Sequence, residues 1–386
     1  GKSTVCIMKP CGEILESPFD IGHTADELDS LISLIKSFDE ETRVVMEDTG
    51  HYHLPVATYL SSHNIFVCCV NALRMKKFCS QSIRRAKTDK FDSIKIASFG
   101  ITYWNELVKA YPSNVIYDEL KFLARQYYQV TGMLVKSKVN FSNLLDQVMP
   151  KINDVLSNQG ENHKLTEFVS RYIHFQNILD MGERKFTSDY CKWAKKKGYR
   201  LNERKAAEIL ALAQNGIPTL PNSQSVKIAV SEAVKLIHSI EESRNTILAQ
   251  MQDLCNTLPE YSVVKEMDCI GDTLAPRIIA EIGDVRRFKN KHSLIAYAGI
   301  DAPPYQSGAF HASERHISKR GNSYLRKTGY EIMQSLIKHK PADNAVYDFI
   351  QKKRSEGKCG KEAMIAGLNK FLRVYYGKVM EFYSEH

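Results

Sequence analysis

The sequence predicts an α/β domain followed by two mainly helical regions, and three observations lead to this prediction. Residues 1–100 alternate short β-rich runs with amphipathic segments, whereas residues 115–149 and 226–258 carry apolar side chains at helical spacing. After Pro259, glycine-rich turns separate shorter amphipathic helices. A chain of 386 residues is long enough for roughly two or three hydrophobic cores. We expect the domains 1–110, 111–258 and 259–386.

Short β-rich runs and one helix open the chain. The predicted elements are a hairpin of strands 3–10 and 13–19 turning at Gly12, a helix at 23–38, and two buried parallel strands at 42–50 and 64–71 joined by a helix. This order of a hairpin followed by α/β units is how an RNase H-like sheet begins. Glu47 falls where the third strand ends, and ligands of open α/β sheets gather at the carboxyl ends of strands. We therefore expect Glu47 to lie near a functional site.

The stretch KTDKFDS, residues 87–93, sets Asp89 and Asp92 three positions apart. A helix that starts here brings both carboxylates onto one face. The ordinary interpretation is a solvated pair flanked by Lys87 and Lys90. The alternative is a divalent cation, because clusters of carboxylate oxygens are the ligands that Mg²⁺ prefers.

Two long helices are predicted in the middle of the chain. Residues 115–149 form the first, and residues 226–258 form the second, which is about 50 Å long at 1.5 Å per residue. An apolar seam of this length must pack on another helix. Packing on the first helix and packing on a second copy of the chain both remain open. Residues 151–220 between them are expected to be helical but polar and basic.

The C-terminal region is predicted to contain a glycine-flanked helix, a basic segment and two further helices. Residues 269–288 place glycines around an amphipathic helix in the manner of a helix-hairpin-helix, whose backbone N–H groups can meet a phosphate. Residues 296–330 are strongly basic, and two amphipathic helices are expected at 331–340 and 361–384.

Composition limits the class of partner. The net charge of +9 and the pI near 8.9 favour a polyanion, although a basic enzyme that binds no nucleic acid also fits. The nine cysteines lack zinc-site spacing, so we expect reduced and mostly buried thiols. Without a bilayer-length apolar run or a signal peptide, no membrane association is expected, and the protein should remain in the cytoplasm, near the nucleoid of a prokaryotic cell.

These segments together resemble the DEDD-type insertion-sequence transposases, the group that includes bridge-RNA-guided recombinases and pilin-gene DNA invertases. The resemblance rests on Glu47, KTDKFDS, IGDTLAPRIIAEIGD, AYAGIDAPPYQSG and KRGNSYLRK in this order. It implies a RuvC-like (RNase H-like) α/β domain with four acidic residues, a long helical or coiled-coil middle, and a mainly helical transposase domain that carries a nucleophilic serine.

Glu47 matches the second acid of that family, and Asp89 and Asp92 match the third and fourth. The resemblance implies that they bind Mg²⁺ or Mn²⁺. The family's first aspartate belongs to an opening pattern like GIDVAKGKS, and this sequence begins at GKS. We therefore expect the metal site to be incomplete in this polypeptide, with Asp20 and Asp48 as poor substitutes.

The family's serine corresponds to Ser307 in PPYQSGAF. The resemblance implies that Ser307 attacks a DNA phosphate, forms a covalent phosphoserine link and passes the strand to a new partner. No ATP is needed, and the sequence has no GxxxxGK[ST] loop. From its chemistry alone, a serine beside a glycine in a proline-rich loop is a turn residue. His311 and His316 either tune this serine or lie on the surface.

Basic side chains are candidate contacts to DNA or RNA backbones. Those expected around the cleavage site are Arg315, Lys319, Arg320, Arg326 and Lys327, and those on the helical middle are Lys136, Lys138, Lys195, Lys196 and Lys197. A merely solvated basic face is the alternative. The implied partners are donor and target DNA, a guide RNA and further copies of the chain, as a dimer or tetramer built through the 226–258 helix.

Three rival interpretations remain. A RuvC-like junction nuclease would cut DNA with metal-activated water and leave a free end. A site-specific invertase would recombine DNA without any guide RNA. A nucleic-acid-binding scaffold would have no catalytic activity, and the expected absence of the first aspartate favours it.

Overall fold

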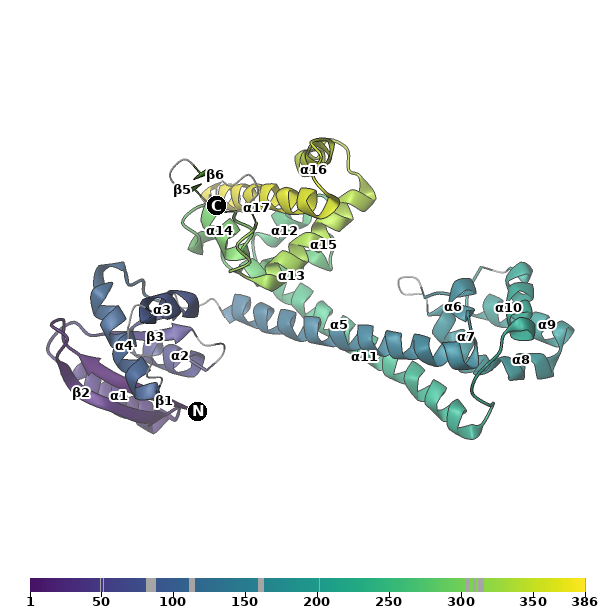
Figure 1. Ribbon diagram of the computed structural model, residues 1–386, viewed down its shortest axis with the longest axis horizontal. Coiled ribbons are helices and arrows are strands. Elements are labelled where there is room, and N and C mark those ends of the chain that lie inside the picture. The colour runs from purple at the N-terminus through teal and green to yellow at the C-terminus, as the bar shows by residue number, and fades with distance from the viewer. Residues whose placement is uncertain are drawn as a thin grey trace. The chain divides into compact units, whose positions relative to one another are not determined.

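The chain divides into two compact units, Gly1–Ser113 and Asn114–His386, in the computed structural model (Figure 1). The structure describes residues 1–48, 50, 52–80, 88–110, 115–158, 163–200, 202–302, 306–307, 310–311 and 316–385. Each unit is considered by itself.

The first unit opens with the predicted hairpin. Strand β1 (Lys2–Met8) pairs antiparallel with β2 (Ile14–Gly22), with Val5 opposite Phe19. The chain reverses through a turn in which the amide of Lys9 donates to the carbonyl of Glu13 over 2.8 Å. Gly12 adopts φ +85°, a backbone conformation that costs glycine least. Gly12 thereby allows the tight reversal between the two strands.

A parallel strand pair follows, as predicted. Helix α1 (Ala25–Lys36) leads to β3 (Arg43–Asp48), and helix α2 (Leu54–Ser62) connects β3 to β4 (Phe66–Asn71). The two strands pair from Arg43 opposite Phe66 to Asp48 opposite Asn71. Parallel strands need such a crossover helix, and both helices bury their apolar sides in the core beneath the strands.

The hairpin and the parallel pair form separate two-stranded sheets among the described residues. Helix α3 (Ala72–Cys79) follows β4, and α4 (Asp89–Thr102), which ends near the short η1 turn (Trp104–Glu106), contacts both β1 and β3. An RNase H-like sheet would be continuous. The order of elements therefore agrees with the expectation, whereas the single RuvC-like sheet stays a prediction.

Two long antiparallel helices organise the second unit. They are α5 (Val115–Val148) and α11 (Gln224–Asn256), and they pack along their length (Figure 1). Tyr117 of α5 shares a core with Cys255 of α11, whereas Val148 shares a second core with Val226. The seam predicted on the second helix thus packs on the first helix of the same chain. Of the two arrangements left open by the sequence, intrachain packing is the one observed.

The segment between the long helices packs into one core with the adjoining halves of α5 and α11. Its helices are α6 (Ile152–Val155), α7 (Lys164–Tyr172), α8 (Phe175–Met181), α9 (Glu183–Lys196) and α10 (Glu203–Asn215). Phe168 and Tyr190 are fully buried there, and Trp193 is nearly so. The polar, basic sequence therefore conceals an aromatic core, because its charged residues occupy the outer helix faces.

The C-terminal part of the second unit is a helical bundle with one short strand pair. Its elements are α12 (Tyr261–Lys265), α13 (Leu274–Ile282), η2 (Val285–Arg287), α14 (Lys291–Ala298), β5 (Gln306–Ser307), β6 (Phe310–His311), α15 (Ser323–His339), α16 (Ala345–Ser355) and α17 (Gly360–Glu385).

Two expectations about this bundle need correction. Helix α13 has the predicted amphipathic sequence, but none of its sides faces solvent, because every residue from Ala275 to Ile282 is buried; the amides of Leu274 and Ala275 donate to the carbonyl of Gly271. Those two amides are thus already engaged, unlike the free N–H groups expected of a helix-hairpin-helix. Helix α15 begins at Ser323, well before residue 331, because Asn322 caps it.

The cysteines and the membrane question complete the description. All nine cysteines are free thiols, but only Cys68 and Cys255 are buried, while Cys11 and Cys359 are exposed. The expectation of mostly buried thiols was wrong, since the other five are only partly covered. Within the described ranges, no helix has both the length and the apolar character to cross a bilayer.

Candidate functional site

The three predicted acidic residues lie at the ends of two elements of the first unit. Glu47 is the penultimate residue of β3, and α4 begins at Asp89. The side chain of Thr88 accepts a hydrogen bond from the amide of Phe91 over 3.3 Å, which fixes the start of this helix. Asp89 and Asp92 therefore both occupy its first turn, where the helix dipole favours negative charge.

The carboxylates of Glu47 and Asp92 repel each other, and this repulsion is seen in the pKa of Glu47. The pKa of Glu47 is raised, first because partial burial desolvates its carboxylate and then because Asp92 and Asp48 are nearby. Asp92 also lies 3.8 Å from the ammonium group of Lys95. Asp89 acts on a different neighbour, since its charge helps to raise the pKa of Lys2 after the larger effect of Asp20. Within the site, repulsion between carboxylates is thus found between Glu47 and Asp92.

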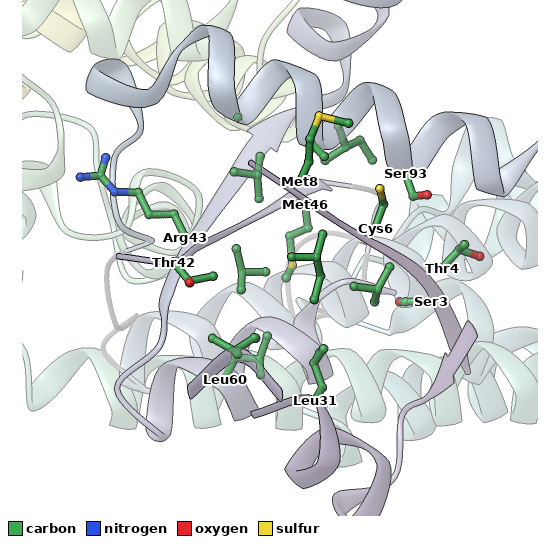
Figure 2. A pocket seen from close by; sticks show the side chains of 18 of the residues that line it. Ser3, Thr4, Cys6, Met8, Leu31, Thr42, Arg43, Met46, Leu60 and Ser93 are labelled. Atoms are coloured by element: carbon green, nitrogen blue, oxygen red, sulfur yellow. The ribbon is translucent and has the colours of Figure 1, made fainter. Parts of the chain in front are cut away.

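A cavity of about 860 Å³ lies between the two sheets, and Glu47, Asp89 and Asp92 are among its lining residues. All of β1 and most of β3 border it, and the remaining walls come from α1, α2 and α4. Figure 2 shows Ser3, Thr4 and Cys6 of β1 and Met46 of β3 around this space, with Leu31 and Leu60 beneath. A strand occupies about 4.8 Å by 10 Å in cross-section and rises about 3.3 Å per residue. The cavity therefore has the volume of a strand of roughly five residues.

The three acids alone do not make a metal site. Carboxylate oxygens suit Mg²⁺ or Mn²⁺. However, in the part of the chain that the structure describes, no three His, Cys, Asp or Glu side chains are placed so that they could hold a metal ion. Asp20 is engaged by Lys2 at 2.8 Å and by Thr4 at 2.7 Å. Asp48 lies 3.7 Å from His53. Neither replaces a missing ligand.

Ser307 belongs to the second unit. It lies on β5 and pairs with Phe310 of β6. The side chains of this strand pair, and so that of His311, lie outside what the structure describes, as does Arg315. His316 is exposed. The backbone position of Ser307 is therefore described, whereas its role as a nucleophile stays a prediction.

The basic residues near Ser307 differ in their surroundings. Lys319 and Arg320 are exposed. Arg326 is half-buried, and its Nη1 donates to the carbonyls of Ala298 and Gly321 over 2.9 and 3.1 Å. Lys327 is exposed, with its ammonium group 5.0 Å from the ring centroid of Tyr128. Lys319 and Arg320 are thus available for phosphate, whereas Arg326 serves the fold.

The five lysines predicted to bind nucleic acid on the helical middle are all exposed, but some have partners. Lys138 forms an ion pair with Glu241 over 2.6 Å. The other carboxylate oxygen of Glu241 borders a cavity of about 310 Å³, which His163 and His238 also line. Lys197 pairs with Glu167 over 2.9 Å. Lys136, Lys195 and Lys196 project from α5 and α9.

One polar cluster close to the serine segment was not found from the sequence. Glu281 of α13 contacts Arg125 of α5 and Asn322 at the start of α15. These three residues are far apart in the chain, so no spacing rule connects them. One local signal was available. Asn322 directly precedes the run SYLRK, and an asparagine in this position is typical of a helix start.

Comparisons with known proteins cover both parts of the candidate site. Residues 1–150 match a DEDD-type family model described as "Transposase", and residues 261–348 match a model described as "Transposase IS116/IS110/IS902 family". The first range contains Glu47, Asp89 and Asp92, and the second contains Ser307.

Individual relatives are more distant. The chain is 22% identical over 299 residues to the insertion element IS110 uncharacterized 43.6 kDa protein of Streptomyces coelicolor, a match that covers 78% of this chain and 72% of that protein. It is 26% identical over 136 residues to the pilin gene-inverting proteins of Moraxella bovis and Moraxella lacunata. These two matches cover 34% of this chain and 42% of each relative.

Proposed function

This chain belongs to the IS110-type family of insertion-sequence transposases, and we propose that it cuts and rejoins DNA through a covalent bond between Ser307 and a DNA phosphate. The observation that carries the proposal is the position of the two family matches. One covers the acidic residues of the first unit, and the other covers Ser307 and the exposed Lys319 and Arg320. The pilin gene-inverting relatives support recombination as the outcome.

The proposed chemistry exchanges one phosphodiester for another. The hydroxyl oxygen of Ser307 attacks the phosphorus, the bond from phosphorus to a deoxyribose oxygen breaks, and the serine proton ends on that leaving oxygen. A second DNA end with a free hydroxyl reverses the step and releases the serine. The number of phosphoester bonds is unchanged, so no nucleotide hydrolysis is required. Lys319 and Arg320 hold the scissile phosphate by charge.

Divalent metal dependence is general in the DEDD-type family, and we propose that Glu47, Asp89 and Asp92 contribute to a site for Mg²⁺ or Mn²⁺. Such an ion polarises a phosphate and orients the reacting groups when it is bound. Because these three acids do not form a complete site, a fourth carboxylate is required.

The proposed partners are donor DNA, target DNA and a guide RNA. Exposed lysines on α5 and α9, among them Lys136, Lys195 and Lys196, supply positive charge for RNA or DNA backbones. Exchange between two duplexes needs four strand cuts, so we propose a dimer or tetramer. Sequencing the nucleic acid that copurifies with the chain tests the guide: a single recurrent RNA supports it, and its absence supports an RNA-independent invertase.

The covalent intermediate is tested by trapping it. We would incubate labelled DNA and Mg²⁺ with the chain of 386 residues and with a version preceded by a strand of the GIDVAKGKS type, then denature the mixture and count label on protein. A label that Ser307→Ala abolishes and Ser355→Ala retains supports the proposal, because Ser355 is an exposed serine of the same unit.

Two results would overturn it. Cut DNA with a free end and no labelled protein indicates a metal-dependent nuclease. Nucleic-acid binding without cutting, in both versions of the chain, indicates a scaffold.

A further inference from the structure

Residues 303–315 are the segment that contains Ser307, which we call the serine segment. The stretches of chain before and after it are joined to each other by hydrogen bonds. Residues 297–302 lead into this segment, and residues 316–322 lead out of it. Backbone bonds connect them from Ser318 N to Asp301 O (2.8 Å), from Lys319 N to Gly299 O (3.0 Å) and from Asn322 N to Tyr297 O (2.6 Å). The hydroxyl of Ser318 adds a bond to the carboxylate of Asp301 over 2.5 Å. We call these two flanking stretches the stems.

Glycines allow the stems to approach closely. A Cβ atom on Gly321 would lie 2.1 Å from the carbonyl oxygen of Tyr297, and one on Gly299 would lie 2.5 Å from the amide nitrogen of Gly321. Gly299 also adopts φ +66°. Any larger residue at either position would force the backbones apart. The backbones of the two stems are therefore in close contact.

Asn322 connects the outgoing stem to the helical bundle. Its Oδ1 accepts the amides of Tyr324 and Leu325 over 3.0 and 3.1 Å, which starts helix α15. Its Nδ2 donates to Oε2 of Glu281 over 2.7 Å. The orientation of the Asn322 amide group, and with it the end of the outgoing stem, is thus set by Glu281.

Glu281 is held in turn by α5. Its side chain has no exposed surface, and Arg125 donates to both carboxylate oxygens over 2.6 and 3.1 Å. The guanidinium of Arg125 also stacks on the ring of Tyr324 at 3.7 Å. A buried carboxylate with two-point pairing has a fixed position, because leaving either oxygen unpaired would be costly. Glu281 therefore joins α5, α13 and the outgoing stem at one point.

We propose that Glu281 is a positioning residue for the reaction at Ser307. It does not touch DNA in this scheme; it fixes the outgoing stem, and hence the approach of the serine segment, relative to the long helix α5. The inference rests on the proposed function of Ser307. Loosening the stem is then expected to slow the covalent step while leaving DNA affinity unchanged.

Glu281→Gln tests this in the version of the protein that is preceded by a strand of the GIDVAKGKS type, because the change keeps the side-chain shape and removes the charge. The matched control is Glu331→Gln: Glu331 pairs with the buried Arg277 over 2.7 Å in the same bundle, and this ion pair does not involve the stems. Two measurements are made. One is hydrogen exchange of the Ser318, Lys319 and Asn322 amides without DNA, and the other is the rate of adduct formation at saturating DNA together with the DNA Kd.

For Glu281→Gln we expect stem exchange to accelerate by about tenfold or more, in line with the loss of a charge-assisted hydrogen bond. The adduct rate is expected to fall by about 100-fold, the effect of a 1 Å misplacement, with Kd within about twofold of the wild-type value. The control should change neither. Unchanged stem exchange in Glu281→Gln, or equal slowing in both variants, overturns the inference. An absence of adduct in the otherwise unchanged protein preceded by the GIDVAKGKS-type strand instead refutes the proposed function, while the exchange measurement still reports on the stem.

Discussion

Gly329, at the contact between α15 and α17, allows a prediction whose magnitude follows from the structure. This glycine lies inside α15, and a Cβ atom there would meet Cδ1 of Leu368 at 2.3 Å and Cδ2 at 3.0 Å. Leu368 is fully buried, so it has no free space into which it could turn. Gly329→Ala is therefore expected to separate the two helices.

The expected free energy is a balance of two terms. Replacing a glycine inside a helix by alanine stabilises the helix by about 1 kcal/mol. Overpacking a buried contact costs about 1–3 kcal/mol. Gly329→Ala should thus destabilise the unit by about 0–2 kcal/mol in total. Gly132→Ala in α5 should give the stabilising term alone, since nothing lies within 4 Å of its Cβ position.

The two variants are compared by thermal unfolding followed by circular dichroism. A change of 1 kcal/mol shifts Tm by about 2–4 °C for domains of 150–250 residues. We expect Gly132→Ala to melt above the wild-type chain and Gly329→Ala below Gly132→Ala by at least about 2 °C. If Gly329→Ala melts as high as Gly132→Ala, the close packing of α15 on α17 is refuted.

Two further predictions concern the other parts of the chain. Because the pKa of Glu47 is raised above its ordinary value of 4.5, its ionisation opposes folding, and this contribution weakens stability as pH rises through the raised pKa. Glu47→Gln should then raise Tm at pH 7 but not near pH 3; equal shifts at both would contradict the pKa argument. Leu145→Ala, at a fully buried position, should cost about 2–5 kcal/mol in urea unfolding. Val139→Ala, at a side chain 56% exposed on the same helix, should change stability by less than about 0.5 kcal/mol.

Local elements were predictable because their signals are local. The hairpin, the parallel pair and both long helices agree with the strand and helix patterns within a few residues. The burial of α13 on all sides was not predictable, because its surroundings come from α5, α11, α12 and α15. The early start of α15 depends on Asn322 as its N-cap, and this residue lies within the basic run KRGNSYLRK, which is also typical of a loop that contacts phosphates.

The candidate site was predictable only where it depends on element ends. Glu47 at a strand end and Asp92 in a first helical turn do approach each other, as expected from those positions. Within the described residues, they do not form with Asp89 a group that could hold a metal ion, and strand-end and helix-start positions alone do not reveal this. The contacts of Glu281 span 156 residues to Arg125 and 41 to Asn322, distances at which only the folded chain reveals proximity.

The path of the chain at Gln147 has a consequence for how the molecule can vary. The carbonyl of Gln147, near the end of α5, accepts the amides of Thr219 and Leu220 over 3.0 and 3.2 Å. The polypeptide therefore departs from the helix pair and comes back to it at the same place. Residues 149–223 also share one core with the adjoining halves of α5 and α11, so a change in their length or packing is felt by that part of the helix pair, whereas the bundle that bears Ser307 keeps its own interior.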